Sequence, residues 1–203
     1  MMLEKDRLGK IMFFLKKKYK RIRYMARGKR SVVYLLNNDY VVKIQRDDIS
    51  ARKVVEKEYY FLKKLSKYRF FPKIISYNKK LKYLVMNYVK GVPLRSVKDL
   101  RIYLKVLEIC RVLDMEGVNQ TEMNNPYKHV IVSKNDVYMI DFERAVESEK
   151  VHNVSQFLSY VLRKINVDRK ELILLAKKYN RKHITMEAFE NHIKYLIKNH
   201  QTN

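Results

Sequence analysis

The chain has 203 residues, enough for one domain of ordinary size or for two small lobes that share a cleft. Hydrophobic residues make up 47% of it, which excludes wholesale disorder, and only four Gly and three Pro leave no flexible linker. With 45 Lys and Arg against 21 Asp and Glu, the formal net charge is +24. Such a charge favours polyanionic partners such as RNA or an acidic protein, although a thermophile-like surface has the same composition.

The sequence gives no sign of a membrane or secretory segment. The longest apolar runs, residues 32–36 and 172–176, are far too short to cross a bilayer. Residues 1–15 carry interspersed charges and no small-residue cleavage site, so we expect no signal peptide. Cys110 is the single cysteine and lies in an apolar helical pattern, which favours a core thiol. These features predict a cytoplasmic protein.

The first half predicts a small antiparallel sheet with one inserted helix, preceded by an amphipathic helix. Asn37, Asn38 and Asp39 tolerate left-handed backbone and predict the turn of a hairpin, and Pro72 ends the inserted helix and its tail. The predicted elements are a helix over residues 3–15, strands 22–25, 31–36 and 40–45, a helix over 50–65, and strands 73–77 and 81–88.

The second half is dominated by helices. A long helix is predicted from an N-cap at Ser96 to a stop at Gly117, followed by a polar stretch over residues 119–128. Two short strands, 129–133 and 137–140, turn through residues 134–136, and three helices follow at about 151–164, 169–179 and 185–199. The change in composition predicts a boundary near residues 88–93, which gives domains 1–88 and 89–203.

Lys43 stands out because it interrupts an apolar strand. Val42 and Ile44 share one face of this strand, so Lys43 is expected on the other face. Glu58 precedes apolar residues at helical spacing and should lie near the face that packs on the sheet, where a carboxylate needs a cation. Pairing with Glu58 would fix the Lys43 ammonium for phosphate binding; Glu56 is the competing partner.

Asp141 ends the apolar run over residues 137–140, so its carboxylate is expected at the end of a strand. In that position it could coordinate a metal carried by phosphates. A turn-forming Asp is the simpler reading of this residue alone, and the order of elements around it decides between the two.

That order resembles the protein-kinase-like superfamily over residues 21–162. It runs from a Gly-containing hairpin through a strand Lys, a helix Glu, a second hairpin, a long helix and a polar loop to Asp-Phe-Glu at 141–143. The closest likeness is to small atypical members: RIO-type kinases and archaeal-type predicted serine/threonine kinases related to lipopolysaccharide-core kinases. The resemblance implies an α+β, two-lobed protein-kinase-like fold, with a small antiparallel-sheet N-lobe containing one helix and a reduced helical C-lobe.

The same resemblance implies a site for ATP and Mg²⁺. Residues 28–34 resemble the RIO-type phosphate loop, with Gly28 as their single glycine, and residues 84–91 resemble the hinge beside adenine, with Met86 as gatekeeper. The implied nucleotide-contacting residues are Gly28, Lys29, Ser31, Val33, Lys43, Met86, Asn87, Tyr88 and Val89.

The polar loop departs from the family pattern because it has no His-Arg-Asp. Glu122 falls where the family carries its acidic catalytic residue, and Lys128 could neutralise charge on the transferred group. His129 falls near the usual metal-binding Asn, with Asn124 and Asn125 as alternative ligands beside Asp141. A solvated loop carboxylate and a core histidine are the structural alternatives for Glu122 and His129.

Glu143 replaces the glycine that lets this segment flip in regulated kinases, and the short segment before residue 151 leaves little room for an activation loop. Asn153 is expected to open the helix that anchors the polar loop, and Arg144 to pair with a nearby carboxylate. The sequence therefore predicts an ATP- and Mg²⁺-dependent phosphotransferase acting on a hydroxyl of a protein Ser or Thr or of a small molecule. The alternative is a pseudokinase-like module that binds nucleotide or RNA without phosphoryl transfer.

Overall fold

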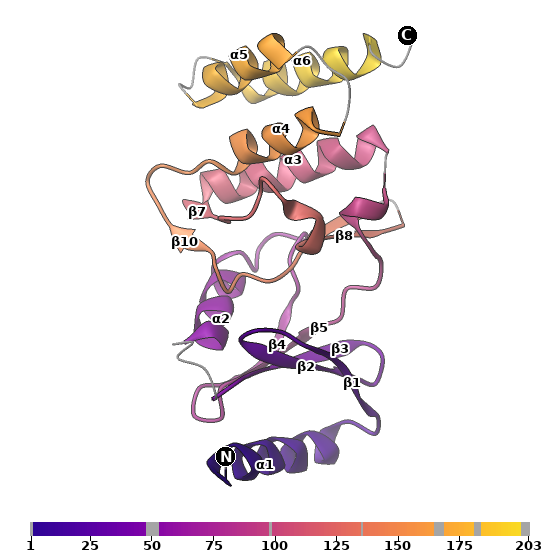
Figure 1. Cartoon of the computed structure of the whole chain (residues 1–203), viewed down its shortest axis with the longest axis vertical. Coiled ribbons are helices and arrows are strands. Elements are labelled where there is room, and N and C mark those ends of the chain that lie inside the picture. Colours follow the sequence, from indigo (N-terminus) through magenta and orange to yellow (C-terminus); the bar gives the residue numbers. More distant parts are fainter. Residues whose placement is uncertain are drawn as a thin grey trace. The chain divides into compact units, whose positions relative to one another are not determined.

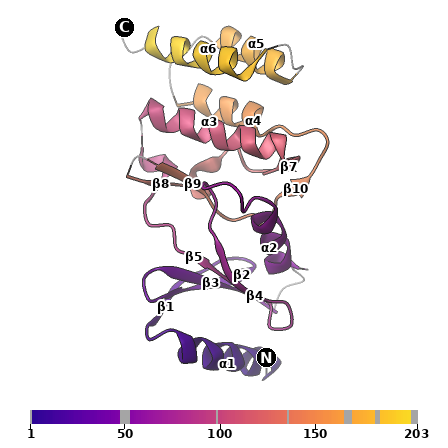
Figure 2. The same ribbon diagram turned by 180° about the vertical axis from the view of Figure 1, so that it is seen from behind.

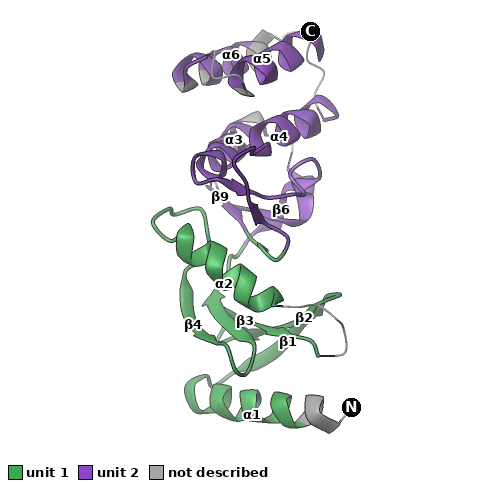
Figure 3. Ribbon diagram, turned by 90° about the vertical axis from the view of Figure 1, so that its left-hand side faces the viewer, with its two compact units in different colours: residues 1–90, 140–143 green, residues 91–139, 144–203 purple. Residues whose placement is uncertain are grey.

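The computed structural model describes residues 2–47, 53–97, 99–134, 136–164, 169–180 and 184–199. The chain forms two compact units (Figure 3): unit 1 comprises residues 1–90 and 140–143, and unit 2 comprises residues 91–139 and 144–203. The polypeptide therefore passes between the units at 90/91, 139/140 and 143/144. Two predicted features, the start of the helix at 50 and the turn residue Asn135, lie outside the described residues.

Unit 1 is a five-stranded antiparallel sheet in the order β1-β2-β3-β5-β4, with α1 and α2 against its opposite faces (Figure 1). Because β3 is the central strand, both of its edges are hydrogen-bonded. The elements are α1 (Met2–Lys18), β1 (Ile22–Arg27), β2 (Ser31–Leu36), β3 (Tyr40–Gln45), α2 (Val54–Lys64), β4 (Ile74–Asn78) and β5 (Tyr83–Asn87).

The α1 face of the sheet forms an apolar core. Ile11 and Leu15 of α1 are buried against a set of sheet residues that alternate along their strands: Leu36, Val42, Ile44 and Val85. Each fully buried side chain of this kind contributes about 1.5–3 kcal/mol. The alternation directs Lys43 to the opposite face, as the sequence predicts.

The predicted hairpin turn is also present. Asn37 and Asn38 have φ of 51° and 67°, in the left-handed region that asparagine tolerates better than most residues. The Asp39 amide donates to the Leu36 carbonyl at 3.2 Å, which closes the turn between β2 and β3. This turn fixes the register that pairs Val33 with Lys43.

Unit 2 is mainly helical, with α3 and α4 side by side and two small antiparallel sheets (Figure 2). Across the described part of the chain, no helix has both the length and the apolar character that a membrane span requires. The elements are β6 (Val92–Pro93), η1 (Leu94–Ser96), α3 (Leu100–Met115), β7 (Val118–Asn119), η2 (Pro126–Lys128), β8 (Val130–Ser133), β9 (Asp136–Met139), β10 (Val146–Glu147), α4 (Asn153–Leu162), α5 (Arg169–Asn180) and α6 (Met186–Asn199).

The start of α3 corrects one prediction. Asp99, and not Ser96, is the N-cap: its side chain accepts a hydrogen bond from the Arg101 amide at 2.9 Å. Ser96 instead is the last residue of the short helix η1, where the Val97 amide donates to the Leu94 carbonyl at 3.0 Å. The predicted stop is correct, since Gly117 follows the helix with a φ of +65° that suits glycine.

Three two-residue strands, β6, β7 and β10, were not predicted. β6 pairs with β8 and β7 pairs with β10, in two-residue ladders too short to give a periodic pattern. Gly91 allows the first of these pairings, because a Cβ at that position would lie 2.3 Å from the Val132 carbonyl oxygen. The absence of a side chain thus lets β6 approach β8.

Candidate nucleotide site and polar loop

Lys43 is the centre of a buried charge cluster in unit 1. Its side chain is 8% exposed, and its Nζ lies 2.7 Å from Glu58 Oε2 and 2.7 Å from Asp141 Oδ1. Glu143 Oε2 is more distant, at 3.5 Å. A lysine so deeply buried needs charged partners, so this cluster fixes the position of the ammonium.

Of the two carboxylates that the sequence offers as partners of Lys43, Glu58 is the one that contacts it. Its side chain is 1% exposed, on the face of α2 that also buries Phe61 and Leu62 against the sheet. Glu56 points elsewhere and pairs with Lys79 at 2.8 Å. The helical spacing that favours Glu58 therefore gives the observed pair.

The neighbouring carboxylates keep Lys43 charged. Burial by itself lowers the pKa of this ammonium, but the negative charges of Glu58 and Asp141 outweigh burial and raise the pKa above its ordinary value. Unit 1 thus holds a permanent cation on its central strand, which is a suitable group for binding phosphate.

Asp141 reaches this cation through an unusual backbone conformation. Its φ is 68°, in the left-handed region where Asp is enriched among non-glycine residues. The next residue, Phe142, is fully buried and packs edge-on against Phe71, with ring centroids 5.5 Å apart. Phe142 anchors residues 140–143 in unit 1, while the Asp141 side chain remains 33% exposed.

The turn between β1 and β2 contains the residues expected to hold phosphate. The Gly28 amide donates to the Ser31 carbonyl at 2.8 Å, and Arg46 Nη1 donates to the Gly28 carbonyl at 3.0 Å. Ser31 is buried, and Lys29 is exposed. Val33 lies opposite Lys43 in the ladder, on the same face of the sheet.

The segment expected to border adenine follows β5. Met86 is buried and lies opposite Val41, again on the Lys43 face. The Asn87 amide donates to the Lys73 carbonyl at 3.0 Å, and the Tyr88 amide donates to the Asp39 carbonyl at 2.8 Å. These two N–H groups are therefore already used inside unit 1.

In unit 2, the polar loop brings Glu122 between two basic side chains. Its Oε2 lies 2.9 Å from His129 Nε2, and Arg144 Nη1 donates to its Oε1 at 2.9 Å. The expected pairing of Arg144 with a nearby carboxylate is therefore present. Both Glu122 oxygens are engaged by the loop's own surroundings, although the side chain keeps 32% exposure.

The other loop residues named from the sequence are exposed. Asn124 and Asn125 have exposed side chains, and the Asn124 carbonyl accepts from Arg163, the residue that follows α4. Lys128 is exposed as well, with its Nζ 5.6 Å from the centre of the Tyr127 ring. All three are therefore accessible surface groups.

Asn153, the first residue of α4, anchors the polar loop through its side chain, as predicted from its position in the sequence. It is fully buried, and its Oδ1 accepts from the Gln120 amide at 2.8 Å. Its Nδ2 donates to the Val118 carbonyl and to Asp114 Oδ1, each at 2.7 Å. One side chain thus connects the end of α3, the loop and α4.

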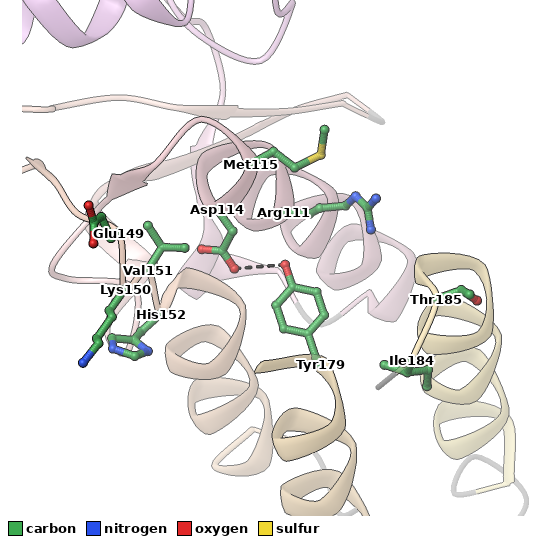
Figure 4. A pocket seen from close by; sticks show the side chains of 10 residues that line it. All are labelled: Arg111, Asp114, Met115, Glu149, Lys150, Val151, His152, Tyr179, Ile184 and Thr185. Atoms are coloured by element: carbon green, nitrogen blue, oxygen red, sulfur yellow. Dashed lines mark hydrogen bonds between the residues drawn. The ribbon is translucent and has the colours of Figure 1, made fainter. Parts of the chain in front are cut away.

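The Asp114 carboxylate also accepts from the Tyr179 hydroxyl at 3.0 Å, beside an open pocket of about 680 Å³ in unit 2 (Figure 4). Burial raises the pKa of Asp114, with the hydrogen bonds from Asn153 and Tyr179 acting in the opposite direction. The pocket carries charges of both signs, including Arg111, Glu149 and Lys150. The hydrogen bond between Asp114 and Tyr179 was not predicted, because these residues lie 65 positions apart in the sequence.

The residues of unit 1 suit a magnesium ion that arrives with phosphates. Such an ion is typically held by one or two carboxylates together with phosphate oxygens and water. Asp141 and Glu143 supply hard oxygen donors beside Lys43. Among the described residues there is no group of three or more His, Cys, Asp and Glu side chains that could hold a metal without such help. His129 and Asn124, the other ligands expected from sequence, belong to unit 2.

Comparison with known proteins identifies a family and a fold. The family model of the RIO domain matches residues 10–170. A search of curated proteins finds no match.

Similar solved structures include the streptomycin–ATP–APH(2")-IIa ternary complex, which is 15% identical with a TM-score of 0.57 and covers 91% of this chain and 85% of its own. The Rio2 kinase from Chaetomium thermophilum is 18% identical with a TM-score of 0.54, and the match covers 74% of this chain and 58% of that kinase. The aminoglycoside phosphotransferase APH(2'')-Ib, bound to ADP, is 13% identical with a TM-score of 0.50 and covers 92% of this chain and 96% of its own. The expected α+β protein-kinase-like fold is thereby confirmed.

Proposed function

The chain belongs to the RIO domain family, and on that premise we propose that it is an ATP- and Mg²⁺-dependent phosphotransferase acting on a hydroxyl group. The observation that carries the proposal is the cluster of Lys43 with Glu58 and Asp141, each at 2.7 Å. Support also comes from the likeness in fold to a phosphotransferase solved with ATP and one solved with ADP. The reaction would take place where ATP is abundant, in the cytoplasm.

In this proposal, unit 1 binds the nucleotide. Lys43 contacts phosphate oxygens, and Glu58 keeps its ammonium in place. Gly28, Lys29, Ser31 and Val33 border the phosphates and sugar, and Met86 with the backbone of residues 87–89 borders the purine. Asp141 would hold the magnesium ion, which would supply positive charge to neutralise the phosphates. In this proposal unit 1 serves as the N-lobe expected for residues 1–88, and unit 2, which holds most of residues 89–203, serves as the C-lobe.

Unit 2 supplies the groups proposed to act on the acceptor. The hydroxyl oxygen of a protein Ser or Thr, or of a small molecule, forms a bond to the γ-phosphorus. The bond from that phosphorus to the β–γ bridging oxygen breaks, and ADP leaves. Glu122 is the proposed acceptor of the hydroxyl proton, because a kinase base needs mainly to orient its substrate. Lys128, an exposed residue of the same loop, is proposed to neutralise the negative charge of the phosphoryl group during its transfer.

A second candidate function is nucleotide or RNA binding without phosphoryl transfer. The observation favouring it is that both Glu122 oxygens are already engaged, by Arg144 and His129 at 2.9 Å each. The net charge of +24 suits an RNA partner. In that case RNA affinity should fall steeply with salt.

Calorimetric titration with ATP, with and without magnesium, tests the proposal. We expect metal-dependent binding by the wild type and loss of the metal effect in Asp141→Asn. Asp39→Asn is the matched control, because Asp39 is an exposed carboxylate of the same unit. An unchanged magnesium effect in Asp141→Asn would contradict the metal assignment, and absence of ATP binding by the wild type would contradict the function.

A further inference from the structure

Glu143 connects two cations in unit 1. Its Oε1 lies 3.3 Å from Arg30 Nη1, and its Oε2 lies 3.5 Å from Lys43 Nζ. The tighter carboxylate contacts of Lys43 are those to Glu58 and Asp141, at 2.7 Å. Arg30 is therefore the closer partner of Glu143, whose side chain is only 17% exposed and needs cationic neighbours.

Arg30 belongs to the turn in which a phosphate would be bound, and one backbone donor of this turn is already used. The Gly28 amide donates to the Ser31 carbonyl at 2.8 Å. Gly28 is the single glycine of the turn, so every other residue there presents a Cβ to an approaching ligand. Side chains must therefore replace much of the backbone contact that a glycine-rich turn could make.

The guanidinium of Arg30 is suited to that task. Its planar set of donors matches phosphate oxygens better than the point charge of a lysine does. Glu143 holds it beside the Lys43 ammonium, since the two oxygens of one carboxylate face the two cations. With Lys43 and Arg30 together, unit 1 presents two cations that can share one polyphosphate.

We propose that Glu143 is a positioning residue that holds Arg30 beside Lys43, so that the guanidinium binds the polyphosphate of the nucleotide. The Arg30–Glu143 contact of 3.3 Å is made through Nη1, and the planar set of five donors lets one guanidinium contact a carboxylate and a phosphate at the same time. This inference rests on the proposed function and assigns two residues to the ligand class that unit 1 would bind. It also gives a physical reason for a glutamate where regulated kinases have glycine.

A positioning role of Glu143 and a purely electrostatic role predict changes of opposite sign in ATP affinity when Glu143 is neutralised. Neutralising Glu143 removes a negative charge close to the phosphates, which by itself would strengthen ATP binding. If Glu143 positions Arg30, the same substitution releases the guanidinium and weakens ATP binding instead. The sign should depend on whether Arg30 is present, which a double-mutant cycle measures.

The experiment titrates ATP and adenosine, in magnesium, into the wild type, Arg30→Gln, Glu143→Gln and the double variant. Arg30→Gln should weaken ATP binding by about tenfold, the size expected for one charge-assisted contact, and leave adenosine binding unchanged. Glu143→Gln should weaken ATP binding several-fold when Arg30 is present and not when residue 30 is glutamine. Lys16→Gln, an exposed charge on α1 across the sheet, is the control for net charge and should change neither affinity.

Three results would overturn the inference. An equal effect of Glu143→Gln in both backgrounds would mean that it does not act through Arg30. A parallel loss of adenosine binding would mean that the substitutions distort the whole site. Failure of the wild type to bind ATP would contradict the proposed function itself, whereas wild-type binding without coupling contradicts only the role of Glu143.

Discussion

The Lys43 cluster and the Glu122 loop hold their carboxylates by different means. Lys43 and Glu58 stand on a central strand and a packed helix, where both are buried and each contacts the other at 2.7 Å. Glu122 lies on a loop with little regular structure, at 32% exposure, and that loop is held by the buried side chain of Asn153. The first arrangement depends on charge balance in a dry environment, and the second depends on a few specific hydrogen bonds. The two regions should therefore fail in different ways.

Removing the lysine should produce the largest effect. Lys43→Ala leaves Glu58 buried without its cation, which costs about 3–5 kcal/mol of unfolding free energy, and it should reduce ATP affinity by at least about 100-fold. Urea unfolding and calorimetry measure the two effects. The double variant Lys43→Met/Glu58→Gln should recover much of the stability and none of the ATP binding. Wild-type ATP affinity in Lys43→Ala would remove Lys43 from the phosphate site.

Removal of the Glu122 carboxylate in the loop should lower the rate of phosphoryl transfer and leave the affinity for ATP unchanged. Glu122→Gln should lower the rate of phosphoryl transfer by about 10²–10⁴-fold, the usual contribution of a positioned acid or base, with ATP affinity unchanged. Transfer of labelled phosphate to the protein itself or to added acceptors measures it. Glu149→Gln, an exposed carboxylate of the same unit, is the control. An unaltered rate would favour the non-catalytic alternative for this loop.

Asn153→Ala tests whether the Glu122 loop depends on the hydrogen bonds of one buried side chain. It leaves the Gln120 amide and the Val118 carbonyl without their partner, so we expect a loss of about 2–3 kcal/mol of unfolding free energy. Asn125→Ala, at an exposed position of the loop, should cost almost nothing. Amide hydrogen exchange should increase in residues 118–122, and unchanged protection there would argue against Asn153 as the support of the loop.

The pH dependence of the unfolding free energy should reveal the contribution of the charged Lys43 side chain. Since the folded-state pKa of Lys43 is raised, its contribution to stability is full below the unfolded-state value of about 10.4 and is lost as pH rises from there through the folded-state pKa. The difference in unfolding free energy between the wild type and Lys43→Met should be constant from pH 7 to 9 and shrink above about pH 10.5. A difference that is flat across the alkaline range would mean that the cluster does not stabilise the charged form.

The smallest effect is expected for an exposed pair. Lys90 Nζ lies 3.0 Å from Asp39 Oδ1, but the two side chains are 64% and 62% exposed. Solvent screening makes such pairs nearly neutral for stability, so Lys90→Gln should leave the midpoint of thermal unfolding unchanged. A shift as large as that of Lys43→Ala would contradict the view that burial decides the contribution of ion pairs here.

The sequence was most informative where periodicity is regular. Alternation in β3 places Lys43 opposite the α1 core, and helical spacing in α2 selects Glu58 over Glu56. Both arguments use neighbours within one element, so they need no knowledge of the rest of the fold. The strands and helices around them were predicted for the same reason.

The parts that escaped prediction depend on residues far apart or on very short elements. Arg30 and Glu143 are separated by 113 positions, and no local pattern indicates that they meet. Asp114 and Tyr179 are equally hidden, and two-residue strands such as β6 and β10 have no period to detect. The cap at Asp99 was missed because Ser96, a good capping residue, lies only three positions earlier.

The return of residues 140–143 to unit 1 has a consequence for synthesis on the ribosome. The sheet of unit 1 ends with β5 at Asn87, but Asp141 and Phe142 emerge more than 50 residues later. During that interval the sheet can form while Lys43 has Glu58 as its partner and Phe71 still lacks the ring of Phe142. Unit 1 therefore matures only after the first segment of unit 2, residues 91–139, has been translated, and a fragment ending at residue 90 would expose an incomplete core.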